Sequence, residues 1–139
     1  MASVVTRRET FTAGHRLFRP EWSDERNREV FGKCSNPSGH GHNYVLEVSV
    51  RSEIDPETGY VFDLGELSRI LHEAVLHDVD HRNLNTDVDW LAGRVPTTEV
   101  LADAIWARLD SLLPGGVLWR VMVRETEKNR AERIREASA

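Results

Sequence analysis

The spacing of apolar and polar positions along the chain predicts four strands. Residues 4–13 are rich in valine, threonine and phenylalanine, which favour extended structure. Side chains of residues 44–51 and 117–124 alternate with a period of two, as in strands with one buried face. In the second of these segments, the expected inward face carries Val117, Trp119, Val121 and Val123. Residues 55–59 (Asp-Pro-Glu-Thr-Gly) have the composition of a hairpin turn, so we expect a return strand to start over residues 60–62.

Two further stretches have helical spacing. Asp63, with Glu66 three residues later, resembles a capping box in which aspartate replaces serine or threonine. The apolar residues that follow this cap recur at helical positions: Leu64, Leu67, Leu71, Ala74 and Val75. A second helix is predicted to open at Pro96-Thr97-Thr98-Glu99, with a threonine as its cap, and to end at the Pro-Gly-Gly of residues 114–116. Four strands and two helices with hairpin-like connections predict an α+β domain with a mostly antiparallel sheet.

Two segments show no clear period. Residues 16–33 are charged and contain Pro20, so we expect an irregular connection, and connections of this length in compact domains are usually functional. The charged residues after Glu127 are expected to fray. A chain of 139 residues has the size of one domain, and we expect residues 1–139 to form a single unit.

Composition and charge limit the classes of function and partner that we expect for this chain. The chain is 40% hydrophobic and 29% charged, which is ordinary for globular proteins. Its net charge of −5 argues against nucleic acid as a partner, although it leaves room for a local pocket that binds a small anion. No apolar run approaches the roughly 20 residues that span a bilayer, so we expect no membrane association. Charged residues at positions 7–9, where a signal peptide needs an apolar stretch, and a single cysteine indicate a cytoplasmic protein.

The tripeptide His40-Gly41-His42 is a candidate metal site. Residues two apart on an extended chain project from one face, so both imidazoles can reach a single ion. His15 lies at the end of the first predicted strand, where a neighbouring strand could place it beside the pair. Three histidines that leave one position open are typical of catalytic zinc. The alternative is that His15 merely ends a strand while the pair faces solvent.

Other polar residues near these histidines are candidates for proton transfer or binding. Cys34 lies on a polar turn just before the histidine pair; a lone cysteine is more often an inert small hydrophobe. Asp80 and His81 are adjacent, so the carboxylate can orient the imidazole only if the backbone turns there; the pair could equally be polar residues at a helix end. Glu125 continues the inward row of the last strand. A buried carboxylate is costly unless it is paired, so either Glu125 lies at an open edge or it binds a polar ligand.

Several motifs, in order over residues 11–127, resemble the 6-pyruvoyltetrahydropterin synthase family. They are FGKCSNPSGHGHNY (residues 31–44), EIDPETGYVFDLGEL (53–67), DHRNLN (80–85), PTTEVLADAIW (96–106) and VRET (123–126). The resemblance implies the tunnelling fold, in which a four-stranded antiparallel sheet carries two helices on one face. It also implies that three subunits join their sheets into a barrel, and that two trimers stack into a homohexamer with active sites between subunits.

The resemblance further implies a lyase that eliminates triphosphate from 7,8-dihydroneopterin triphosphate and forms 6-pyruvoyltetrahydropterin, a step of tetrahydrobiopterin biosynthesis. Zn²⁺ would be held by His15, His40 and His42. Cys34 matches the family's proton acceptor, and Asp80 with His81 matches its partner relay.

For the substrate, the resemblance implies an anchor and a surrounding pocket. Glu125 matches the residue that anchors the pterin, and Thr97, Thr98 and Glu99 match the surrounding pterin pocket. The related 6-carboxytetrahydropterin synthase of the queuosine pathway shares the fold, zinc and substrate, but it typically has a shorter loop between the cysteine and the histidine pair. Five residues separate Cys34 from His40 here, which favours the pyruvoyl-forming enzymes. A non-catalytic relative that binds pterin or metal is the third alternative. The chain departs from the family pattern after Glu125, where a charged tail replaces a strand-like ending.

Overall fold

Five strands form one sheet in the computed structural model, which describes residues 1–136 of the chain. The strand order is β3-β1-β2-β4-β5. The strands are β1 (Ser3–His15), β2 (His40–Ser52), β3 (Arg82–Asn83), β4 (Leu118–Arg124) and β5 (Arg130–Ile134). The pairs β1–β2, β2–β4 and β4–β5 are antiparallel, whereas the two-residue β3 runs parallel to β1. The mostly antiparallel sheet is therefore confirmed, with five strands instead of four.

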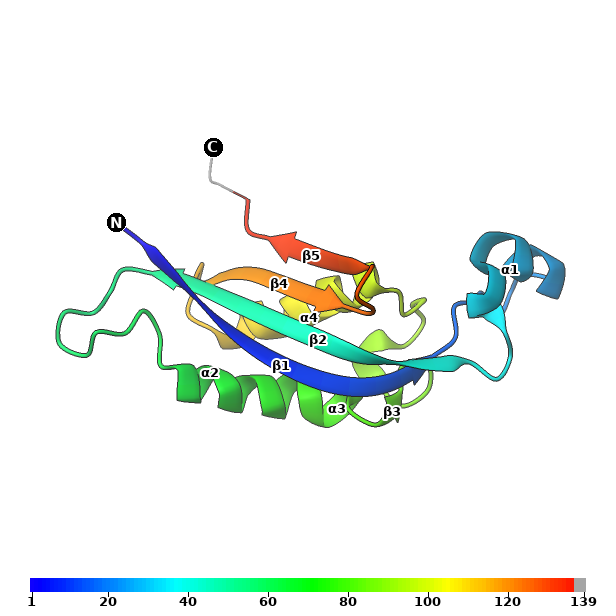
Figure 1. The fold of residues 1–139 in the computed structure, drawn as a ribbon, viewed down its shortest axis with the longest axis horizontal. Helices are drawn as coiled ribbons and strands as arrows, with labels where there is room; N and C mark the ends of the chain where they lie inside the picture. The colour runs from blue at the N-terminus through cyan, green and yellow to red at the C-terminus, as the bar shows by residue number, and fades with distance from the viewer. Residues whose placement is uncertain (137–139) are drawn as a thin grey trace.

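Helices cover one face of this sheet (Figure 1). The long ones are α2 (Leu64–Leu71), continued by a π-helical turn η2 (His72–Leu76) and α3 (His77–Val79), and α4 (Thr98–Leu112). Shorter ones are α1 (Asp24–Phe31) and the 3₁₀ helices η1 (Gly32–Ser35) and η3 (Asp89–Leu91). Both predicted caps are confirmed: the Asp63 carboxylate accepts from the backbone N–H of Gly65 at 2.9 Å, and the Thr97 hydroxyl accepts from that of Val100 at 3.1 Å. No helix within residues 1–136 has the length and apolar character needed to cross a bilayer.

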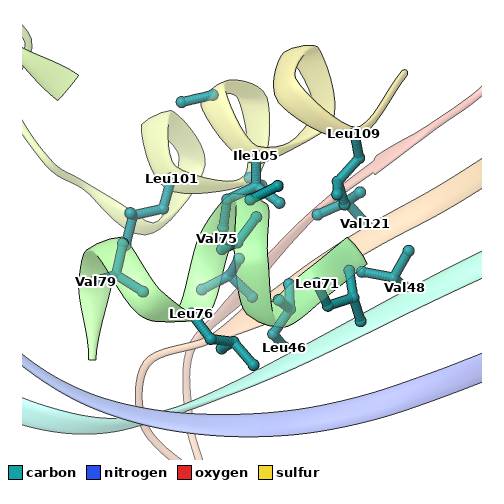
Figure 2. Close-up of a cluster of buried hydrophobic side chains, with 14 of the residues drawn as sticks. Leu46, Val48, Leu71, Val75, Leu76, Val79, Leu101, Ile105, Leu109 and Val121 are labelled. Atoms are coloured by element: carbon teal, nitrogen blue, oxygen red, sulfur yellow. The ribbon is translucent and has the colours of Figure 1, made fainter. Parts of the chain in front are cut away.

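The core lies between the sheet and the two long helical segments. Figure 2 shows side chains from the sheet and from both helical segments meeting there, among them Leu46 from β2, Val121 from β4, Leu71 from α2 and Ile105 from α4. The row of β2 that faces the helices begins with His40 and His42 and continues into these apolar residues. The buried sheet face therefore ends, at the start of β2, in the candidate metal ligands.

The return strand expected over residues 60–62 does not form. The Asp55 N–H donates to the Tyr60 carbonyl at 2.8 Å, and the Gly59 N–H donates to the Asp55 carbonyl at 2.8 Å, so residues 55–60 close a tight loop. Beyond this loop the chain bends directly into α2. The physical reason is that both edges of β2 are already paired, one with β1 and the other with β4, and no edge remains for a return strand.

The tail expected to fray instead forms β5. It pairs with β4 from Arg124↔Arg130 to Arg120↔Ile134, and its charged residues form ion pairs that include Arg133–Asp103 and Arg120–Glu132. An edge strand needs only one ladder and little apolar surface, so its charged sequence carries a weak strand signal. The part of the expected tail at residues 137–139 lies outside the described residues.

Residues 16–33, expected to be irregular, contain α1. The Ser23 hydroxyl caps this helix by accepting from the Arg26 N–H at 3.1 Å, and the buried Asn27 side chain bonds the backbone of Arg19 in both directions. The helix projects beyond the end of the β1–β2 hairpin (Figure 1). Because it does not pack on the core, its sequence lacks the apolar period on which a helix prediction relies.

A bulge also changes the inward row of β4. The register with β2 shifts between Ser49 and Val50, so that Leu118 instead of Trp119 pairs with Val50. Leu118 is fully buried, whereas Trp119 is half-buried and lies under the Arg51 guanidinium. The expectation that Trp119 shares a face with Val121 and Val123 is therefore wrong, because one extra residue reverses the alternation.

Two leucines of α4 offer a matched test of this core. Leu101 is 0% exposed and Leu112 is 56% exposed. Leu101→Ala should lower the free energy of unfolding by about 2–5 kcal/mol, because it removes a buried side chain and leaves a cavity. Leu112→Ala should change it by no more than about 0.5 kcal/mol. Urea unfolding of the two variants measures the difference, and equal effects would contradict the placement of α4.

Candidate functional site

Pairing of β1 with β2 brings three histidines together at one end of the sheet. The register places His15 opposite His40, and His42 follows two residues later on the same face. The three ring centroids lie 4.7–5.2 Å apart, and one nitrogen from each ring falls within 4.8 Å of the others. The turn into β2 requires glycine at position 39, since φ is +68° and an added Cβ would lie 2.9 Å from the His15 carbonyl oxygen.

Hydrogen bonding and burial prepare these imidazoles to bind a metal ion. The Pro96 carbonyl lies 2.9 Å from Nδ1 of His15, so Nδ1–H donates to it and Nε2 is left without a proton. Burial lowers the pKa of His15 and of His42, which keeps both rings neutral, as metal ligands must be. The Nε2 atoms of His15 and His40 lie 3.1 Å apart.

The Nε2 atom of His42 is the strongest sign of a missing partner. It is buried and makes no hydrogen bond. Buried polar atoms without partners are rare because they have lost the hydrogen bonds of water and gained none in return. A metal ion held by the three histidines would satisfy it. The residues present therefore fit a metal ion, in agreement with the sequence prediction for the histidines.

Tyr44 supports the cluster from behind and was not among the predicted site residues. Its ring stacks on Phe11 with centroids 4.8 Å apart, and its hydroxyl lies 3.4 Å from Nδ1 of His15. Burial raises the pKa of Tyr44, so the phenol keeps its proton. The signal was available in the sequence, since Tyr44 continues the inward row of His40 and His42 by two residues.

Glu125 lies directly beside the histidine cluster, just after β4 ends. Its Oε1 is 3.4 Å from Nε2 of His42, and its Oε2 accepts a hydrogen bond of 2.8 Å from the Thr98 hydroxyl. The side chain is only 17% exposed, so the expected pairing of an inward carboxylate is present. Held in this way, the carboxylate keeps lone pairs free for a ligand that donates hydrogen bonds.

All four residues predicted to bind substrate line one pocket of about 440 Å³, which we call the Glu125 pocket. It contains Thr97, Thr98, Glu99 and Glu125, together with Leu17 and the β4–β5 turn. The Thr97 hydroxyl already caps α4, whereas Thr98 holds Glu125. The volume is in the range of small-molecule sites. The binding roles of these residues stay predictions.

The Asp80–His81 pair adopts the turned geometry that its predicted role requires. His81 is the only non-glycine residue of the described chain with positive φ, at 60°, and its Nδ1 lies 3.0 Å from Oδ1 of Asp80. Hydrogen bonds, first from the Thr12 N–H and then from His81, lower the pKa of Asp80 and keep it ionised. Strained backbone at such a residue is common in functional sites. The pair lies at the β1 edge, where Asp80 also lines a hollow of about 670 Å³.

Cys34 lies in η1, on the excursion between β1 and β2, and its carbonyl accepts from the Leu17 N–H at 2.8 Å. Its thiol is free and half-buried. Within residues 1–136, no hydrogen bond joins this thiol to the three histidines or to the Asp80–His81 pair. A single copy of the chain therefore brings the histidines and Glu125 together, but leaves the two proton-transfer candidates as separate groups.

The fold and the site define an α+β protein in which three histidines that could hold a metal ion lie beside a carboxylate-lined pocket. Residues 4–136 match the family described as 6-pyruvoyl tetrahydropterin synthase, and the chain belongs to this family. The chain is 50% identical over 125 residues to human 6-pyruvoyl tetrahydrobiopterin synthase, covering 90% of this chain and 86% of the human one. It is 46% identical to the Drosophila melanogaster protein of that name, covering 91% and 76% of the two chains. The structure of Caenorhabditis elegans 6-pyruvoyl tetrahydropterin synthase superposes with a TM-score of 0.91 at 39% identity, covering 98% of this chain and 97% of that one.

Removal of either histidine of the pair should abolish metal binding. We expect His40→Ala and His42→Ala proteins, loaded with a divalent transition metal and dialysed, to retain far less than one ion per chain. His72→Ala, which removes an exposed histidine of η2, is the matched control and should retain the wild-type content. Elemental analysis measures the ion, and circular dichroism checks the fold. Some loss of thermal stability is expected, since bound metal stabilises the folded state. Full stoichiometry in both pair variants would contradict the assignment.

Proposed function

We propose that this chain converts 7,8-dihydroneopterin triphosphate into 6-pyruvoyltetrahydropterin and eliminates triphosphate, as a zinc-dependent carbon–oxygen lyase. The observation that carries this proposal is the convergence of three imidazole nitrogens beside the Glu125 carboxylate, in a chain of the 6-pyruvoyl tetrahydropterin synthase family. A substrate in the Glu125 pocket would have its reacting side chain next to the histidines.

His15, His40 and His42 would hold the zinc ion. Three imidazole ligands and one open position are the arrangement of catalytic rather than structural zinc sites. When bound, zinc would supply Lewis acidity that makes the C–H protons next to ligated oxygens easier to remove. The hydrogen bond from His15 to the Pro96 carbonyl fixes the ring that presents Nε2.

Glu125 would orient the pterin. The amino group and ring N–H of a pterin lie side by side and can both donate to one carboxylate, and such charge-assisted pairs are stronger than neutral ones. The Thr98 hydroxyl holds Oε2 of Glu125 in place for this contact. Thr97 and Glu99 complete the walls around the ring.

Cys34, with the Asp80–His81 pair, would move the protons. A thiolate at Cys34 can take a proton from the substrate side chain, and His81, oriented by Asp80, can return it to another carbon. The redistribution is internal and needs no external redox cofactor. A thiolate base requires reduced cysteine, which suits the cytoplasm that we propose as its location.

We further propose a homohexamer built from two stacked trimers. β3 pairs with β1 only at Ala13 and Gly14, so residues 3–12 of β1 leave an open edge on one side of the sheet, and β5 is the outer strand on the other. Open edges on opposite sides of one sheet can pair head to tail and close a ring. In that ring, the β1 edge of one subunit, where Asp80 lies, approaches the β5 edge of its neighbour, and β5 follows shortly after Glu125 in the chain. The relay would then act across the subunit boundary.

Product analysis tests the proposed reaction. Mass spectrometry after incubation of the zinc-loaded protein with 7,8-dihydroneopterin triphosphate should detect 6-pyruvoyltetrahydropterin and free triphosphate.

The same assay tests Cys34. Cys34→Ala should keep its zinc but lose about 10²- to 10⁴-fold in turnover, because one positioned base is gone. For the wild-type protein, the identity of the product decides between the related activities. Formation of 6-carboxytetrahydropterin and acetaldehyde would reassign the chain to the related activity. Unchanged substrate would indicate a non-catalytic binding protein.

A pterin-affinity measurement tests Glu125 by itself. Glu125→Gln keeps the shape of the side chain but places an NH₂ opposite a donor of the ligand. We expect the binding free energy of a non-reacting pterin to weaken by about 1.5–3 kcal/mol, the scale of a hydrogen bond to a charged group. Zinc content should not change. Glu127→Gln, at an exposed position of the β4–β5 turn, is the control and should bind like wild type. Equal calorimetric affinities of the two variants would show that Glu125 does not hold the pterin.

A further inference from the structure

Two pockets adjoin the histidine cluster. The Glu125 pocket adjoins His42 through the 3.4 Å approach of Glu125. A second pocket of about 370 Å³, which we call the Arg16 pocket, has His15 and His40 in its own wall. Arg16 lines the Arg16 pocket, and the next residue, Leu17, lines the Glu125 pocket. The two pockets therefore share one short segment of backbone.

The Arg16 pocket is distinguished by its charge. Its lining contains one arginine and two histidines and no carboxylate. Four other pockets within the described residues each contain at least one acidic side chain, for example Glu125, Asp80, Asp78 or Glu132. In a chain with 23 acidic and 18 basic residues, a hollow of this size without a carboxylate is a local environment that favours an anion.

The arginine in this pocket is fixed in position. Its Nε donates to the Ser35 carbonyl at 2.7 Å, and its guanidinium lies 3.8 Å from the centroid of the Phe18 ring. Its backbone N–H and carbonyl are both bonded by the Asn85 side chain, at 2.7 and 2.8 Å. No carboxylate within residues 1–136 forms an ion pair with it. A planar guanidinium held in this way retains terminal N–H groups suited to two oxygens of a phosphate.

We propose that the Arg16 pocket binds the triphosphate group of the substrate, with Arg16 as its anion-binding residue. This inference rests on the proposed function. The pterin then occupies the Glu125 pocket, the triphosphate occupies the Arg16 pocket, and the carbons between them lie across the three histidines. The pterin end of the substrate donates hydrogen bonds and therefore suits the pocket that contains the Glu125 carboxylate. The triphosphate end is a polyanion and therefore suits the pocket that contains Arg16 and no carboxylate.

The rival anchor is the basic pair Lys128 and Arg130 in the Glu125 pocket. A triphosphate there would share the hollow with the carboxylates of Glu99 and Glu125, which repel it. It would also compete for space with the ring that Glu125 holds. The charge distribution therefore favours Arg16 over this pair.

Calorimetric titration of inorganic triphosphate into the zinc-loaded protein separates the two anchors. Wild type should bind it, and Arg16→Gln should bind it roughly ten- to a hundredfold more weakly, the scale of a hydrogen bond to a charged group. The double variant Lys128→Gln/Arg130→Gln should bind it like wild type. Ser38→Asp, at an exposed position of the Arg16 pocket wall, should also weaken binding by adding a negative charge while keeping Arg16. Zinc content and circular dichroism check that each variant is intact.

A second titration, with 7,8-dihydroneopterin without phosphates, makes the result specific. Arg16→Gln should bind this compound like wild type, since the pterin end is unchanged. Any of three results would overturn the inference. The first is that wild type does not bind triphosphate. The second is that Arg16→Gln and Ser38→Asp both bind it as tightly as wild type, and the third is that only the double variant loses it. Failure of the protein to bind dihydroneopterin while triphosphate still depends on Arg16 would instead contradict the proposed function and leave the anion site standing.

Discussion

The antiparallel ladder between β1 and β2 is the constraint on which the site depends. It runs without a break from Ser3↔Ser52 to His15↔His40, so each residue of one strand fixes the face of its partner. A slip of one residue would turn the histidines of β2 away from His15 and would also expose Leu46 and Val48. The apolar core therefore enforces the register, and the register assembles the three histidines. Gly39 makes this possible at the end of the ladder, where the chain passes against the His15 carbonyl too closely for a side chain.

The histidine cluster shows the cost of such a site. Burial takes His15 and His42 out of water and lowers their pKa, and it leaves Nε2 of His42 without a hydrogen bond. These terms oppose folding in the absence of a metal ion. They also supply neutral imidazoles with free lone pairs at a fixed spacing, which is what an ion requires. Stability is thus given up at the end of the sheet, away from the apolar centre formed by residues such as Leu71 and Ile105.

The sequence predicted the helices and strands that bury one face in the core, but it did not predict the elements at the edges of the fold. Composition predicted β1, and the periods of two and 3.6 predicted β2, β4, α2 and α4, because their apolar rows contact the core. The same reasoning missed α1 and β5, which are held by a serine cap, an asparagine side chain and ion pairs instead of apolar burial. It also failed at the bulge beside Trp119, where one extra residue depends on the neighbouring strand. In the site, spacing alone gave the His40–His42 pair, whereas the Pro96 carbonyl behind His15 is distant in sequence and only the fold brings it near.

The charge in each pocket differs from the net negative charge of the whole chain. A net charge of −5 would disfavour a polyanionic substrate at long range, but salt screens exposed charges beyond about 8 Å at physiological ionic strength. What an approaching substrate experiences is therefore the lining of each pocket. The Glu125 pocket combines the carboxylates of Glu99 and Glu125 with the basic pair Lys128 and Arg130, whereas the lining of the Arg16 pocket contains no carboxylate. His15 and His40 line the Arg16 pocket and His42 lies beside Glu125, so an ion held by the three histidines would add positive charge close to both pockets. In the binding mode that we propose, the difference between the two pockets would favour one orientation of a substrate with unlike ends, and that orientation would place its reacting carbons at the three histidines.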